Sequence, residues 1–184
     1  AYPSIEDYDD IDTRNAYRTM IEEEITPQEA LAEAQRISRD NARTPMQWDD
    51  SAYGGFSDHT PWLGVNPNYK EINAASQMAD DSSVFRFYQK LIALRKEHPV
   101  MAHGDLHLCC PEEGPVIAYT RSYQDETWLA VHNFSQDVQK FQYAGTGLQL
   151  DTSVLLSNYP EHDICPEDEI LTLKPYETVI FRLS

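Results

Sequence analysis

Carboxylates are the most numerous side chains in this sequence that could carry out acid–base or nucleophilic chemistry. They gather in three short runs, at residues 7–10, 22–24 and 80–81. A catalytic pair of carboxylates needs rigid elements that hold the two groups at a fixed separation. Runs of like charge are instead typical of a solvated surface, because neighbouring carboxylates repel each other. We therefore expect these runs to face solvent, and we assign no catalytic residue to this chain.

Histidine and cysteine give little support for metal or redox chemistry. The six histidines are scattered, without a His-x-x-x-His pair or a carboxylate at ligand spacing. Cys109 and Cys110 are adjacent and Cys165 is remote, which matches neither a metal site nor a disulfide framework. We expect no metal, no cofactor and a reducing, cytoplasmic location. His132, inside a predicted strand, is expected to face solvent or a hydroxyl.

A long polar segment, residues 39–70, holds the side chains best suited to binding a ligand. It is rich in Pro, Gly, Asn, Asp and Trp without periodicity, and it exceeds the roughly 12–15 residues usual for a structureless connection. Arg39 and Arg43 carry planar guanidinium groups with several fixed donors. Asn41 lies between them and could bind a ligand or the loop's own backbone.

Helices are predicted on both sides of this loop. The run Thr26-Pro27-Gln28-Glu29 combines a capping hydroxyl, a proline at the first helical position and a glutamate three residues after the cap. It predicts a helix to about Ser38, preceded by a weaker one over Thr13–Glu24. A third helix, at about 82–98, carries Phe85, Tyr88 and Leu91 near one face and is stopped by Pro99.

Beyond the third helix the hydrophobic pattern changes to alternation, which is typical of strands. Short antiparallel strands are predicted over residues 116–122, 127–134, 152–157, 170–173 and 178–183. Turn residues between them recur at 113–115, 124–126, 145–147 and 174–176, the spacing expected of a small β-sandwich. We place a domain boundary near residues 100–104.

The loop sequence resembles a known family. Ser38-Arg39-Asp40-Asn41-Ala42-Arg43-Thr44-Pro45-Met46-Gln47-Trp48-Asp49, followed by Val65-Asn66-Pro67-Asn68-Tyr69-Lys70-Glu71-Ile72-Asn73, resembles the oligo-1,6-glucosidase subgroup of the alpha-amylase superfamily. The resemblance continues through residues 83–96 and more loosely to 173–177, so it covers essentially the whole chain.

The resemblance implies an α+β fragment: the helical C-terminal end of a (β/α)8 barrel followed by a small antiparallel β-sandwich domain. Residues 1–100 would end the catalytic barrel, with loop 39–70 facing substrate, and residues 101–184 would form the β domain. The missing N-terminal portion of the barrel is then an expected partner.

The resemblance also implies an activity for the longer parent. Members of the subgroup carry a nucleophilic aspartate, an acid/base glutamate and a stabilising aspartate on upstream barrel strands, and none of these three motifs is present here. The parent is expected to remove terminal α-linked glucose from short oligosaccharides, through α-1,6 or α-1,4 bonds. Alternatives are a trehalose-6-phosphate hydrolase, a sucrose isomerase, or a non-catalytic accessory or carbohydrate-binding β module.

The loop residues acquire expected roles from the same resemblance. In such enzymes the arginine of Asn-Ala-Arg-Thr-Pro, here Arg43, pairs with a barrel aspartate and reaches hydroxyls of the terminal glucosyl unit. Arg39 and Asn41 are further substrate-binding candidates, and the alternative for Arg43 is a structural role within the loop. Asp40 and Gln47 are expected to bind backbone.

The loop also carries large aromatic side chains. Trp48, Phe56 and Trp62 could stack on sugar rings, but a private core for the loop is the expected role, because aromatic residues bury large apolar areas.

Net charge and hydropathy exclude two classes of partner. The 31 acidic and 14 basic residues give a net charge of -17, which disfavours nucleic acid and anionic lipid but leaves neutral ligands unaffected. No apolar run approaches the roughly 20 residues of a membrane span. We therefore expect neither a nucleic acid nor a membrane partner.

Overall fold

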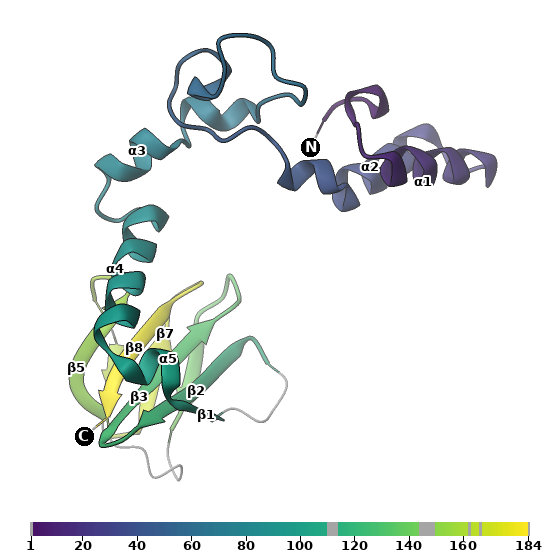
Figure 1. Cartoon of the computed structure of the whole chain (residues 1–184). Helices are drawn as coiled ribbons and strands as arrows, with labels where there is room; N and C mark the ends of the chain where they lie inside the picture. The colour runs from purple at the N-terminus through teal and green to yellow at the C-terminus, as the bar shows by residue number, and fades with distance from the viewer. Residues whose placement is uncertain (1, 110–113, 144–149, 162, 166, 184) are drawn as a thin grey trace. The chain divides into compact units, whose positions relative to one another are not determined.

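The computed structural model describes residues 2–109, 114–143, 150–161, 163–165 and 167–183 (Figure 1). The chain divides into two compact units, residues 1–85 and 86–184. Helices make up the ordered elements of the first unit, and an antiparallel β domain dominates the second. The predicted α+β fold class is confirmed.

The first unit begins with a pair of packed helices. A 3-10 turn, η1 (Ile5–Asp7), precedes α1 (Ile11–Glu22) and α2 (Pro27–Ile37). The predicted capping box is present, because the Thr26 side chain accepts from the Glu29 amide while the Glu29 side chain accepts from the Thr26 amide. Ala30 and Ala34 are the buried residues of α2, so small side chains face the contact with α1. Both predicted helices are confirmed, and α1 begins two residues early.

The predicted loop contains short helical turns rather than a fully irregular chain. These turns are η2 (Arg39–Ala42), η3 (Ala52–Gly55) and η4 (Pro67–Lys70), and the short helix α3 (Ala74–Ala79) follows the predicted loop. Glycine is required at the tightest point, since a Cβ on Gly55, at φ +68°, would lie 2.7 Å from the Asp49 carboxylate. The Gly54 carbonyl accepts the amides of Trp48 and Asp49, which folds the loop back on itself.

The second unit contains the remaining helices and all of the strands. The helices are α4 (Val84–Glu97), which starts at the end of the first unit, and α5 (Pro99–His103). The strands are β1 (Asp105–Leu108), β2 (Val116–Tyr123), β3 (Glu126–Asn133), β4 (Gln139–Gln142), β5 (Leu150–Ser157), β6 (Asp163–Cys165), β7 (Ile170–Leu173) and β8 (Thr178–Leu183). All five predicted strands are confirmed, and β1, β4 and β6 were not predicted.

The turns between strands agree with the sequence where the structure describes them. Gln124 and Tyr176 adopt positive φ angles of 53° and 54° in the β2–β3 and β7–β8 turns. Both turns therefore lie at the predicted positions, whereas the predicted turn at 145–147 lies outside the described residues.

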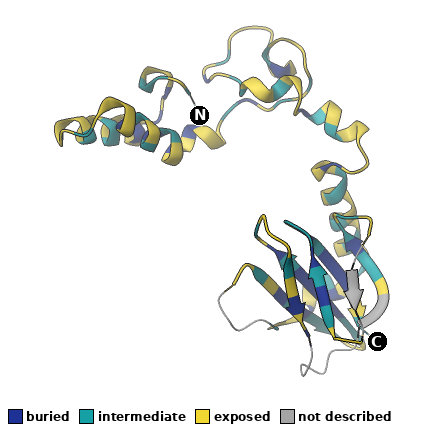
Figure 2. Ribbon diagram, turned by 180° about the vertical axis from the view of Figure 1, so that it is seen from behind, coloured by how far each residue is buried: buried dark blue, intermediate teal, exposed yellow. Residues whose placement is uncertain are grey.

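The strands form two antiparallel sheets that enclose an apolar core. One sheet has the order β1-β2-β3-β8-β5 and the other β4-β7-β6. Side chains from both sheets meet in the core, which contains Ala118, Leu129, Val131, Phe141, Tyr143, Leu171, Leu173, Val179 and Phe181. Figure 2 shows this burial along the strands. Burial of each large apolar side chain contributes about 1.5–3 kcal/mol, so the predicted sandwich has a core of its own.

Helices α4 and α5 cover part of the outer face of the larger sheet. Phe87, Leu91 and Leu94 pack against a cluster that includes Trp128 and Ile180. Phe85 and Tyr88, predicted on the same face as Leu91, are exposed instead. The compact units divide within the first turn of α4, after Phe85, because the rest of this helix packs on the sheet. The predicted domain boundary near residues 100–104 stays a prediction.

Candidate substrate-facing site

Asp10 lies at the centre of a polar network in the first unit. Its side chain is only 4% exposed, and it caps α1. Asp10 Oδ2 accepts hydrogen bonds from the Thr13 amide at 3.3 Å and from the Thr13 hydroxyl at 2.6 Å. That hydroxyl also lies 3.0 Å from the Ser38 hydroxyl. Asp10 is therefore tied both to the start of α1 and to the end of α2.

Arg39 binds the other oxygen of the same carboxylate. Its Nε and Nη2 atoms donate to Asp10 Oδ1 at 3.0 and 2.5 Å, and Nη2 also donates to Asp12 Oδ2 at 2.6 Å. The hydrogen bonds from Arg39, followed by that from Thr13, lower the pKa of Asp10 from 3.8 to about 2. The same pairing raises the pKa of Arg39. Both partners are consequently charged at neutral pH.

Asp40 and Arg43 form a second part of the network. Asp40 is fully buried, and its Oδ2 atom accepts the amides of Asp9 and Asp10 at 2.7 and 2.8 Å. Its Oδ1 atom has no hydrogen-bond partner among the described residues, and Arg43 Nη1 lies 3.6 Å from it. Arg43 Nη1 is also 3.9 Å from Asp10 Oδ1. The Arg43 side chain remains 45% exposed, so its guanidinium can donate to a ligand.

The structure brings together two of the three predicted binding residues. Arg39 and Arg43 share Asp10 as a counter-charge. Asn41 is directed to the backbone instead, because its amide donates to the Gln35 carbonyl at 2.8 Å. The backbone roles expected for Asp40 and Gln47 are confirmed, since Gln47 Nε2 donates to the Ile72 carbonyl.

Sequence reasoning missed Asp10. The expectation that Asp7, Asp9 and Asp10 face solvent is wrong for Asp10, although Glu22–Glu24, Asp80 and Asp81 are exposed as expected. The available signal was an aspartate three residues before Thr13, which is the spacing of a helix N-cap. The predicted start of α1 at Thr13 concealed it.

The aromatic residues of the loop also differ from expectation. Trp48, Phe56 and Trp62 are exposed, the last with 66% of its surface accessible. The prediction of a private aromatic core is therefore wrong for this chain. The loop is held by backbone hydrogen bonds to Gly54 and by Leu63, which is buried. The aromatic faces are free to contact another group.

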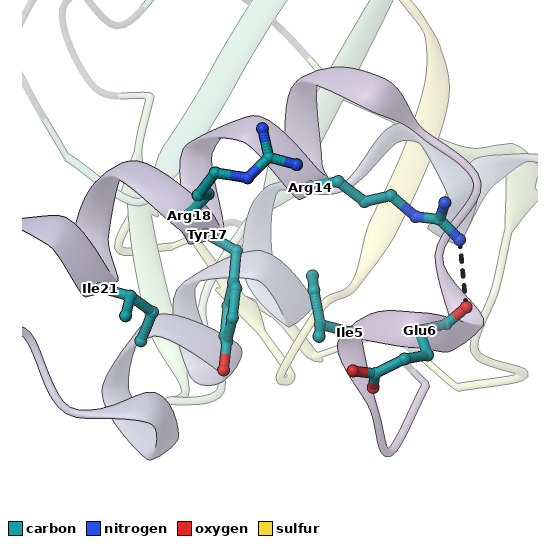
Figure 3. Close-up of a pocket in the computed structure, with 6 residues that line it drawn as sticks. All are labelled: Ile5, Glu6, Arg14, Tyr17, Arg18 and Ile21. Atoms are coloured by element: carbon teal, nitrogen blue, oxygen red, sulfur yellow. Dashed lines mark hydrogen bonds between the residues drawn. The ribbon is translucent and has the colours of Figure 1, made fainter.

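A separate open cavity of about 400 Å³ lies between η1 and α1 (Figure 3). Its lining mixes apolar and charged side chains: Ile5, Glu6, Arg14, Tyr17, Arg18 and Ile21. Arg14 is already engaged, because its Nη2 atom donates to the Glu6 carbonyl at 3.1 Å. None of the predicted binding residues lines this cavity.

In the described part of the second unit, charged side chains meet at Glu126, whose Oε1 atom lies 3.8 Å from both His98 Nδ1 and Arg182 Nε. His132 lies 3.1 Å from the Thr178 hydroxyl, as expected, and burial lowers the pKa of this histidine. No group of three His, Cys, Asp or Glu residues in the described part of the chain could hold a metal ion. Across the described residues, none of the helices has the length and apolar character that a membrane span requires.

Two family models match the chain. The alpha-amylase catalytic domain matches residues 6–104, and the C-terminal domain of the alpha-amylase SusG matches residues 116–180. The first match contains the whole Asp10–Arg39–Arg43 network, and the second contains most of the β domain.

Related proteins are similar along the entire chain. An oligo-1,6-glucosidase from Halalkalibacterium halodurans is 41% identical over 180 residues, which cover 98% of this chain and 32% of that protein. A trehalose-6-phosphate hydrolase from Bacillus subtilis is 34% identical over 185 residues, covering 100% and 32%.

A solved structure is also similar to this chain along its entire length. The trehalulose synthase MutB from Pseudomonas mesoacidophila MX-45 is 37% identical, with a TM-score of 0.89, over 100% of this chain and 33% of its own. This chain therefore spans about a third of the length of the relatives that it matches. Because the catalytic-domain match alone covers more than half of its residues, the chain belongs to the alpha-amylase family.

Proposed function

We propose that this chain is part of a retaining glycosidase that removes terminal α-linked glucose from short oligosaccharides, through α-1,6 or α-1,4 bonds. The observation that carries the proposal is the pair of half-exposed arginines, Arg39 and Arg43, held around the buried carboxylate of Asp10. The similarity to oligo-1,6-glucosidases over almost the whole chain supports the same substrate class.

The two arginines suit the recognition of sugar hydroxyls. Each guanidinium has several donors in one plane, and on Arg39, where Nε and Nη2 already donate to Asp10 and Asp12, Nη1 is the atom proposed to reach sugar hydroxyls. Asn41 is a weaker candidate, since its amide already donates to backbone. The exposed rings of Trp48 and Trp62 offer apolar faces against which a sugar ring can pack.

The catalytic carboxylates are proposed to lie in the upstream part of the parent. A retaining mechanism needs two carboxyl groups about 5–5.5 Å apart, one to attack and one to transfer a proton. Asp10 and Asp40 are occupied by arginine, hydroxyl and amide donors. The isolated chain is accordingly proposed to be inactive.

The proposed partner within the parent is the N-terminal portion of the barrel. Helix α4 packs on the β-sheet through one side and leaves another row exposed, made of Val84, Phe85, Tyr88 and Ile92. Such an apolar row favours contact with further protein. Residues 1–100 would then complete the barrel and residues 101–184 would form the accessory β domain, in a cytoplasmic enzyme.

Two alternative activities are favoured by specific relatives. One relative is a trehalose-6-phosphate hydrolase, and one similar structure is a trehalulose synthase. Assays of the full-length parent with isomaltose, maltose, trehalose 6-phosphate and sucrose distinguish the three. Glucose release from isomaltose or maltose supports the proposal, whereas exclusive turnover of the phosphorylated sugar, or isomerisation of sucrose, replaces it. Turnover by the isolated chain would contradict the assignment of the carboxylates.

Arginine variants of the parent test the site itself. Arg39→Gln and Arg43→Gln each remove charge-assisted hydrogen bonds worth about 1.5–3 kcal/mol, which corresponds to a loss of roughly 10- to 100-fold in kcat/KM. Arg36→Gln is the matched control, because Arg36 lies on the surface of α2 and pairs with Glu33. An unchanged kcat/KM in both test variants would refute a substrate role for the two arginines.

A further inference from the structure

We infer that Asp10 is a positioning residue, which fixes the direction in which Arg39 and Arg43 present their guanidinium groups to the substrate. The inference rests on the proposed function, because it names how the proposed binding pair is held. Asp10 itself is almost completely buried, so it acts through the arginines.

The Asp10 carboxylate has little freedom to move. Its backbone amide donates to the buried Asp40 carboxylate at 2.8 Å, and its Oδ2 atom accepts from Thr13. The Thr13 hydroxyl in turn contacts Ser38 at the end of α2. Two separate parts of the first unit, the start of α1 and residues 38–40, therefore determine where Oδ1 lies, and a group constrained in this way can serve as a fixed reference point.

The remaining oxygen faces the two arginines. Arg39 approaches Asp10 Oδ1 through both Nε and Nη2, which fixes the plane of its guanidinium. Arg43 Nη1 lies 3.9 Å from the same oxygen and 3.6 Å from Asp40 Oδ1. The two arginines therefore lie next to Asp10 Oδ1, while about half of each side chain stays exposed.

The substitution Asp10→Asn separates positioning from helix capping. Asparagine caps helices as well as aspartate does, so its Oδ1 atom can still accept from Thr13, but the negative charge opposite the arginines is lost. In the full-length parent we expect kcat/KM for isomaltose to fall about 10²-fold, because a small displacement of binding groups has effects of that size. The melting temperature should also fall, because the ion pair with Arg39 contributes stability, so kcat/KM is compared at a temperature well below unfolding.

Asp12→Asn is the matched control. Asp12 also accepts from Arg39 Nη2, but its side chain is 74% exposed, so solvent screens this contact far more than the buried contact with Asp10. This variant should retain most of the activity. The double variant Asp10→Asn/Arg39→Gln should lose less than the product of the two single losses, because part of the effect of Asp10 acts through Arg39 and the rest through Arg43. Multiplicative losses in the double variant would overturn the inference.

A chemical probe tests the same contact without any enzymatic activity. Phenylglyoxal modifies arginines according to their accessibility, and mass spectrometry reports the rate at each site in the 184-residue chain. In Asp10→Asn we expect Arg39 and Arg43 to react severalfold faster while Arg36 is unchanged. Unaltered rates at Arg39 and Arg43 would contradict positioning by Asp10. If the parent lacks glucosidase activity but these rates rise, the proposed function fails and the positioning by Asp10 stands.

Discussion

Each of the two compact units is stabilised internally by a different kind of interaction. In the described part of residues 2–85, the large buried side chains are Tyr8 and Leu63, and they are accompanied by buried polar groups on Asp10, Thr13 and Asp40. In residues 86–184, the core consists of aliphatic and aromatic side chains contributed by two sheets. The first unit depends on directional hydrogen bonds and ion pairs, and the second depends on apolar burial.

This difference separates positioning from stability. Apolar packing is non-directional and contributes roughly in proportion to the area buried. Hydrogen-bonded charges contribute less net stability because they lose solvation, but they fix the direction of each group. The arginines proposed to bind substrate lie in the polar unit, where direction matters. The β domain can supply stability without carrying a site.

The largest expected effect comes from the apolar core. Phe181→Ala removes a fully buried ring between the sheets and should lower the free energy of unfolding by about 3–5 kcal/mol. Phe134→Ala is the control, because that ring is 65% exposed. Denaturant titration followed by fluorescence of the buried Trp128 measures both. Equal losses of unfolding free energy in the two variants would mean that apolar burial is not what stabilises the second unit, and the contrast with the first unit would fail.

The buried carboxylate of the first unit should have a smaller and more local effect. Asp40→Ala leaves the amides of Asp9 and Asp10 without their acceptor, and an unsatisfied buried donor costs about 1–3 kcal/mol. Hydrogen exchange at the Asp10 amide should accelerate roughly 10- to 100-fold, while exchange in the β-sheet is unchanged. The exposed neighbour provides the control variant, Asn41→Ala. A simultaneous loss of protection in both units would show that they unfold together.

The same contrast explains how much of the fold could be predicted. Strands β2, β3, β7 and β8 bury alternate or successive apolar residues, so their pattern is visible in the sequence. β1 is exposed along its whole length, and β4 and β6 have only four and three residues. Such strands exist because a neighbour pairs with them, and a pattern of hydrophobicity does not contain that information.

The candidate site was predictable only in part. Arg39, Asn41 and Arg43 lie in one motif, so resemblance could identify them together. Asp10 lies 29 positions from Arg39, in a run of acidic residues that looks solvated. Its burial depends on Asp40 and Ser38, which reach it only after α1 and α2 have packed. A charged residue buried by tertiary contacts has no local signature.

Acid should weaken the first unit through the ion pair of Asp10. The pKa of Asp10 is lowered from 3.8 to about 2, so its ion pair contributes stability that is fully present above pH 3.8 and is lost as the pH falls through about 2. Carbon-13 NMR of the Asp10 carboxyl should therefore show a midpoint near 2. A midpoint at 3.8 would mean that Arg39 does not bind this carboxylate in solution.

The smallest expected effect is at the capping box of α2. Thr26→Ala removes the acceptor for the Glu29 amide and should cost about 1 kcal/mol, whereas Thr26→Ser keeps the hydroxyl and should be nearly neutral. Exchange of the Glu29 amide reports the local change. Ser38, which caps the C-terminal end of α2, lies beside Thr13 and Asp10. Fraying at the N-terminal end of α2 should therefore leave phenylglyoxal modification of Arg39 unchanged. A faster reaction at Arg39 in Thr26→Ala would mean that the network depends on the entire helix rather than on the contacts around Asp10.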